Sequence, residues 1–179
     1  QVEAGSFRSS TIYTTTGSVA RVATSLTRSW NFPSNNFSGQ IKVRPRFAST
    51  SIVGTDYFLG YGADLNYALN IYADPTRISL RKENLSVGDL GLPLYMTFTQ
   101  GELLNIRFRV SSAGMKLWIN DETPVSDTTS AARAAWATAP TATMRLAQAS
   151  NGAIGYFEAI ESLKLWHEAK SDEFLEALE

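Results

Sequence analysis

The sequence contains no cysteine and only one histidine, His167, among its 179 residues. A disulfide framework and a thiolate centre are therefore excluded, and so is a metal centre built from histidine and cysteine. Charged residues make up only 18% of the chain, which is below the usual quarter. The longest apolar runs fall far short of the ~20 residues that a membrane-spanning helix needs. We therefore expect no thiol chemistry, no His/Cys metal centre and no membrane insertion.

A strong excess of charge is also missing, because the net charge is −1. This balance excludes general nucleic-acid binding through bulk charge. Residues 158–179 hold seven acidic and two basic residues, whereas residues 1–157 hold ten acidic and fourteen basic residues. We interpret the acidic end as a solvated terminal helix, with a basic face elsewhere as the alternative. The chain begins at Gln1 and not at a methionine, so we expect a part of a longer protein or a processed product.

What the sequence does contain is typical of an all-β protein. Serine, threonine, β-branched and aromatic residues are spread along the chain and are separated by frequent turn signals. Strands are expected at 39–47, 56–61, 67–72, 76–83, 94–98, 103–110, 115–121, 142–148 and 156–166. Short helices are expected at 130–136 and at 171–178, where Ser171 can cap. Residues 1–29, which are rich in threonine and serine, are predicted to be an extended arm or linker, and residues 30–179 to form one folded domain.

Alternation of apolar and polar residues predicts which side chains form the core. The residues expected to face inward are Ile78, Leu80, Ile106, Phe108, Val110, Met115, Leu117 and Ile119. The last strand changes phase, because Ile160, Leu163 and Leu165 are all apolar. A β-bulge near residues 161–162 would place all three in the core.

Two segments near the C-terminus resemble a known family. Residues 114–121 (GMKLWIND) are similar to a hairpin strand of concanavalin A-like and laminin-G-like domains, with Asp121 in place of the expected glycine. Residues 155–178 (GYFEAIESLKLWHEAKSDEFLEAL) are similar to the closing strand and short helix of the same domains. The resemblance implies a concanavalin A-like jelly-roll β-sandwich with an extended N-terminal arm and a short C-terminal helix. Domains of this kind mostly bind sugars.

The first 26 residues are similar to a segment that recurs in phage tail-fibre and minor virion structural proteins. The match lies on Gln1, Glu3, Gly5, Ile12, residues 14–17, Val19, Arg21 and Ala23, whereas Tyr13 and Thr24 depart from the pattern. The resemblance implies a phage tail fibre, tailspike or related appendage, located in the virion at the tail or particle surface. It also implies other virion proteins and host-surface polysaccharide as partners, and a homo-oligomer with a trimer favoured.

Outward-facing bases and tryptophans form the candidate glycan-binding set. Indole rings stack on sugars, and arginine pairs with carboxylates, so the combination suits an acidic polysaccharide. The set is Trp118, Trp166, Arg107, Arg109, Lys116, Lys164, Arg77 and Arg81. Two alternatives stay open: these residues lie on two different sheets, or the tryptophans pack against a neighbouring chain. Trp30 and Trp136 are expected in the core or under loops.

No resident cofactor and no catalytic residue are expected. A jelly-roll glycoside hydrolase needs two carboxylates across the sugar, but Glu158 and Glu161 are three residues apart and therefore point to opposite faces of a regular strand. A bulge could bring them to one face, but no third acid lies between them as in the glucanases of this fold. A calcium site is a minor alternative, from Asp56, Asp64, Asp74, Asn120 and Asp121, which turn chemistry also explains. The sequence thus favours a non-catalytic module for glycan recognition or assembly in a virion. A structural virion protein acting through subunit contacts is the alternative, and a hydrolase is the least favoured.

Overall fold

The computed structural model describes residues 26–29, 35–62, 67–84, 90–135, 143–146 and 159–178. The strands in these ranges are β1 (Leu26–Ser29), β2 (Phe37–Arg44), β3 (Asp56–Gly62), β4 (Tyr67–Asp74), β5 (Arg77–Asn84), β6 (Leu90–Tyr95), β7 (Leu104–Ser111), β8 (Gly114–Ile119), β9 (Val125–Asp127), β10 (Thr143–Leu146) and β11 (Ala159–Trp166). The helices in these ranges are a 3-10 turn (Ser49–Ser51), α1 (Ser130–Arg133) and α2 (Asp172–Glu176).

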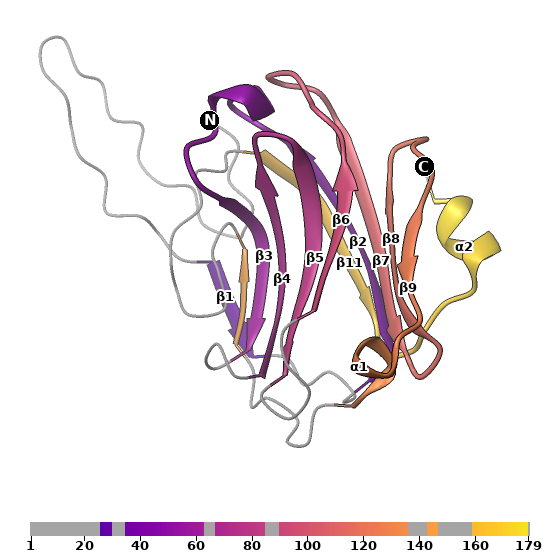
Figure 1. The fold of residues 1–179 in the computed structure, drawn as a ribbon. Coiled ribbons are helices and arrows are strands. Elements are labelled where there is room, and N and C mark those ends of the chain that lie inside the picture. Colours follow the sequence, from indigo (N-terminus) through magenta and orange to yellow (C-terminus); the bar gives the residue numbers. More distant parts are fainter. Residues whose placement is uncertain are drawn as a thin grey trace, which may run out of the picture.

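The strands form two antiparallel sheets that pack face to face (Figure 1). The six-stranded sheet has the order β1-β10-β3-β4-β5-β6, and the five-stranded sheet has the order β11-β2-β7-β8-β9. Helix α2 lies on the outer side of the five-stranded sheet (Figure 1). The pairing of β2 with β11 and of β3 with β10 joins segments that are far apart in the sequence. The architecture is therefore an all-β sandwich, as the composition predicts.

The core lies between the sheets and is built from the predicted alternation. Ile106 and Phe108 of β7, with Leu117 of β8, have no exposed surface. Burial of each such side chain contributes about 1.5–3 kcal/mol to folding. Every residue named above as inward-facing in β5, β7 and β8 belongs to this core cluster, so the predicted faces of these strands are confirmed.

The last strand confirms the predicted bulge. The register of β11 against β2 shifts between Ile160 and Ser162. As a result Ile160, Leu163 and Leu165 all pack against the core. Helix α2 begins after Ser171, whose hydroxyl accepts a hydrogen bond from the amide of Phe174 at 3.2 Å, so the predicted cap is also confirmed.

Several elements differ from the sequence-based expectation. Strand β6 runs over Leu90–Tyr95 and not over 94–98. Gly91 and Pro93 suggest a turn in the sequence, but proline is tolerated here because β6 is at the edge of its sheet.

The three-residue strand β9 was not predicted. Residues 26–29, which were assigned to the arm, form β1 and pair with β10, and residues 1–25 lie outside the described residues. Helix α1 ends at Arg133, and Trp30 and Trp136 lie outside the described residues.

Candidate functional site

The structure divides the eight predicted binding residues between the outer faces of the two sheets. Arg77 and Arg81 are on β5, in the six-stranded sheet. The other six are on the five-stranded sheet, where direct pairing places them in two neighbouring rows. One row contains Lys164, Arg107 and Trp118, and the other contains Trp166, Arg109 and Lys116. All eight side chains face away from the sandwich interior, but they do not lie on one continuous surface.

On the five-stranded sheet, α2 covers the centre of the predicted set. Trp118 is 2% exposed and Arg107 is 6% exposed. The indole Nε1 of Trp118 donates to Oε1 of Glu176 at 3.1 Å. Arg107 donates from Nη1 to the carbonyl oxygens of Leu175 and Glu176, each at 3.2 Å. A cation at this position satisfies carbonyls at the C-terminal end of the helix.

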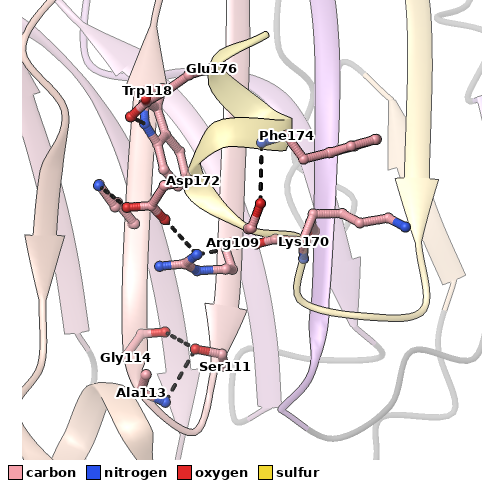
Figure 2. A network of polar contacts seen from close by, with 12 residues as sticks. Arg109, Ser111, Ala113, Gly114, Trp118, Lys170, Asp172, Phe174 and Glu176 are labelled. Atoms are coloured by element: carbon pink, nitrogen blue, oxygen red, sulfur yellow. Dashed lines mark hydrogen bonds and ion pairs between the residues drawn. The ribbon is translucent and has the colours of Figure 1, made fainter. Parts of the chain in front are cut away.

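Asp172 connects the start of α2 to the same face (Figure 2). Its carboxylate is 2.5 Å from Arg109 and 2.6 Å from Lys116. Both cations also lie over the ring of Trp118, with Arg109 at 5.7 Å and Lys116 at 4.8 Å from its centre. Burial alone would raise the pKa of Asp172, but the hydrogen bond from Lys116 and the charge of Arg109 outweigh it and hold that pKa below the usual value.

The edge of this face is bound to the C-terminal segment as well. Trp166 packs edge-to-face on Phe174, with 5.4 Å between ring centres. Lys164 remains exposed. The bases and tryptophans of the five-stranded sheet other than Lys164 thus form a docking surface for α2 inside the chain. Glycan binding by this surface stays a prediction, and it would require the helix to leave.

The outer face of the six-stranded sheet carries a different cluster, which contains Arg77, Arg81 and three tyrosines. Tyr95 is directly opposite Arg77 across the β5–β6 pair, and its side chain is 71% exposed. Tyr57 and Tyr72 are opposite each other across the β3–β4 pair, half-buried, with ring centres 5.7 Å apart. We call these five residues the tyrosine–arginine face.

Arg77 is held in place by the turn that joins β4 to β5. One carboxylate oxygen of Asp74 accepts from the amide and the hydroxyl of Thr76, each at 3.0 Å, and the other accepts from Nε of Arg77 at 2.6 Å. Burial alone would raise the pKa of Asp74, but these hydrogen bonds keep it below its usual value. The guanidinium carbon of Arg77 lies 6.0 Å from the ring centre of Tyr95. The turn thus fixes a cation beside an exposed aromatic ring.

Arg81 lies two rows further along the same face, beyond the row of Ser79 and Tyr72. Its Nε is 3.3 Å from Glu83, whose side chain is only 3% exposed. Asn70, which is opposite Arg81, donates to the same carboxylate at 3.4 Å. Gly91 is opposite Arg81 on the other side, and a methyl group added there would meet nothing within 4 Å. The face therefore offers aromatic rings and hydrogen-bond donors beside open space.

The tyrosines of this face and Arg145 were not among the residues predicted from the sequence. Arg145 of β10 shares a sheet face with Arg81 through Gly60 and Asn70, and its Nη1 donates to the carbonyl of Gly62 at 3.0 Å. The same alternation that placed Arg77 outward could have found Tyr72, which is two residues before Asp74 on β4. It could not have shown that Tyr95 is beside Arg77, because that depends on the register of β6.

The acidic residues considered for catalysis and calcium are placed as follows. Glu158 and Asp64 lie outside the described residues, and Glu161 is at the bulge, where it forms an ion pair with Nε of Arg44 at 2.5 Å. Asn120 has a positive φ of 47°, and its Oδ1 accepts from the amide of Asn105 at 2.8 Å, so it acts as a turn residue. Within the described ranges no three acidic or histidine side chains are grouped as metal ligands. Among the same residues, no helix has the length and apolar character to cross a bilayer.

Comparison of the sequence with known protein families and with curated proteins gave no match. Solved structures do match. The carbohydrate-binding module CBM40 of the Ruminococcus gnavus IT-sialidase, bound to α2,3-sialyllactose, has a TM-score of 0.62 at 14% identity, with 79% of this chain and 80% of that chain covered. Domain 4 of AbnA, a GH43 extracellular arabinanase from Geobacillus stearothermophilus, in complex with arabinotriose, has a TM-score of 0.61 at 16% identity, covering 79% and 65%. A SAP-like pentraxin from Limulus polyphemus has a TM-score of 0.57 at 15% identity, covering 84% and 73%.

These similarities establish the fold. The chain is a concanavalin A-like jelly-roll β-sandwich with a short C-terminal helix, as the resemblance of residues 114–121 and 155–178 implied. None of the solved structures named here is a phage tail protein, so the phage assignment rests on the first 26 residues alone.

Proposed function

We propose that this chain is a non-catalytic glycan-binding module, and that the tyrosine–arginine face of the six-stranded sheet is its binding surface. One observation carries the proposal: Tyr95 is largely exposed beside a cation that the β4–β5 turn holds in place. Tyrosine combines an apolar ring, on which a sugar can stack, with a polar hydroxyl. Arginine donates several hydrogen bonds in a fixed geometry, which suits hydroxyl and carboxylate groups.

The comparisons support glycan recognition more than catalysis. Two of the similar solved structures are binding modules in complex with oligosaccharides. The choice of face follows from burial, because α2 leaves only the rim of the five-stranded sheet exposed near Trp118. Of the residues predicted from the sequence, Arg77 and Arg81 are therefore the ones that we assign to glycan binding.

A glycan array probed with the full chain tests this proposal, followed by titration of the best ligand. Tyr95→Ala should weaken binding by about 1–3 kcal/mol, on the scale of an important aromatic contact. Phe174→Ala is the matched control, because Phe174 is 39% exposed on α2, which lies on the outer side of the other sheet (Figure 1). Equal losses in the two variants, or no binding to any glycan, would contradict the proposal.

We also propose that the module works in a virion appendage such as a phage tail fibre or tailspike, with host-surface polysaccharide as its ligand. The support is the resemblance of the first 26 residues to segments of phage structural proteins. Action through subunit contacts is the alternative for the same location. The two differ in whether the isolated chain binds glycan at all.

A further inference from the structure

We propose that Arg77 recognises an anionic group of the glycan, so that the module prefers sugars that carry a carboxylate or a sulfate. This inference rests on the proposed function and names the class of its ligand. Arg77 and Tyr95 would act together: the ring of one sugar residue packs on Tyr95, while the anionic group of that residue meets the guanidinium group.

Arg77 is positioned before any ligand arrives. Asp74 contacts Arg77 through Nε, and this ion pair does not use the two terminal nitrogens of the guanidinium group. The side chain of Arg77 is 37% exposed, so a ligand can reach it. A guanidinium group binds planar anions such as carboxylates with two parallel hydrogen bonds. A side chain already fixed by its neighbours loses less entropy on binding.

Asp74 does not cancel this preference for an anion. Its carboxylate accepts three hydrogen bonds, from Thr76 twice and from Arg77 once, and its side chain is only 14% exposed. A ligand therefore meets the guanidinium group and not the carboxylate. Arg81 is less suited, because the residue opposite it on β6 is Gly91, which offers no ring on which a sugar can pack.

Tyr95 is in a position to act together with Arg77. Its ring lies next to Arg77, with 6.0 Å between the ring centre and the guanidinium carbon, and 71% of its side chain is exposed. An acidic sugar residue is large enough to contact both groups at once. A neutral sugar would contact only Tyr95. An acidic sugar would therefore bind more tightly than its neutral counterpart.

The test uses matched ligands on the full chain. Glucuronate-, galacturonate- and sialate-containing oligosaccharides are each compared with their carboxyl-reduced forms, and 3′-sulfolactose is compared with lactose. We expect the anionic member of at least one pair to bind about tenfold tighter or more, which is the scale of one charge-assisted contact. A preference only in the carboxylate pairs, or only for sulfolactose, identifies which anion Arg77 recognises.

Three variants connect this preference to Arg77. Arg77→Gln should abolish the preference for the anionic ligand. Arg77→Lys should keep only part of this preference, because lysine keeps the charge but loses the planar fork. Arg133→Gln removes one positive charge from the exposed end of α1 and should keep the preference. Melting temperatures of all three confirm folding. Equal affinity within every pair, or a preference that survives in Arg77→Gln, overturns this inference and leaves the proposed function standing. No binding to any glycan overturns both.

Discussion

At the scale of single residues, Trp118 shows that a side chain can point out of the sandwich and still be buried. Its neighbours Leu117 and Ile119 point into the core, so Trp118 faces out of the sandwich, as alternation predicts. It is nevertheless 2% exposed, because α2 covers it and Glu176 accepts its indole hydrogen. Two cations over its ring further connect it to the helix. Through these contacts Trp118 contributes to the free energy of unfolding of the chain.

We therefore expect Trp118→Ala to destabilise the fold by about 3 kcal/mol, as loss of a buried aromatic side chain does. The matched control is Lys164→Ala, which shortens an exposed side chain on the same face and should change stability by less than about 0.5 kcal/mol. Urea unfolding of the two variants and the wild type measures the effect. An unchanged midpoint for Trp118→Ala would show that α2 does not stabilise this face.

A second prediction at this scale concerns Asp172 and pH. Its pKa in the folded chain lies below the usual 3.8, so the native state binds fewer protons than the unfolded state in this range. The stabilisation from Asp172 is thus present above the unfolded pKa and is lost as the pH falls through the lower folded value. We expect Asp172→Asn to be less stable than the wild type at about pH 6, with the difference shrinking toward about pH 3. A difference that stays constant over this range would mean that the contacts with Arg109 and Lys116 do not depend on the carboxylate charge.

At the scale of elements, α2 illustrates a helix that tertiary contacts hold in place. Five residues are too few for a helix that is stable in water on its own. Ser171 caps its first turn, Leu175 is fully buried beneath it, and Arg107 satisfies carbonyls at its end. Sequence pattern located the helix because the cap and the apolar positions are local. The contact between α2 and Trp118 could not be predicted in this way, because β8 and α2 are more than fifty residues apart in the sequence.

The hairpin of β7 and β8 gives a prediction about one glycine. Gly114 has a φ of 131°, and a Cβ atom added there would be 2.2 Å from the carbonyl oxygen of Asp127. Gly114→Ala should therefore cost about 2–3 kcal/mol, from backbone strain and overpacking together. Gly91→Ala is the control, because a Cβ atom at Gly91 meets nothing within 4 Å. Thermal unfolding of both variants tests this prediction, and similar melting temperatures for Gly114→Ala and Gly91→Ala would contradict it.

At the scale of the whole molecule, the sandwich holds together through pairings of distant segments. β2 pairs with β11 and with β7, and β10 pairs with β1 and with β3. Because residues 26–29 belong to the six-stranded sheet, a truncation that keeps β1 should keep the sandwich. This allows the proposed role of the preceding residues in assembly to be tested separately from folding.

Deleting residues 1–25 should leave a folded β-sandwich with a circular dichroism spectrum of the same type, while its mass shifts from an oligomer toward a monomer. The reason is that residues 1–25, which the sequence predicts to be extended and rich in serine and threonine, would satisfy their backbone groups along another sheet edge or a neighbouring subunit. Light scattering on the full and truncated chains measures the mass, with a trimer as the expected full-length state. A full chain that is already monomeric would refute this role, and so would a truncation that unfolds.

The chain as a whole should not hydrolyse polysaccharide. The motivation is that Glu161 lies in an ion pair with Arg44 at the bulge of β11, and that the sequence has no third acid between Glu158 and Glu161. Incubation with capsular or cell-wall glycans, followed by an assay for new reducing ends, tests this. Turnover that disappears in Glu161→Gln would overturn it.

Periodicity and local chemistry were enough to predict the strands, the bulge of β11, the cap at Ser171 and the inward residues of β5, β7 and β8. These features depend on neighbours within a few residues, so a one-dimensional pattern contains them. The partners of the outward residues depend on sheet order and on strand register, which long-range contacts set. For that reason only the tertiary structure decided that Trp118 and Arg107 lie beneath α2, and that the largely exposed Tyr95 lies beside Arg77.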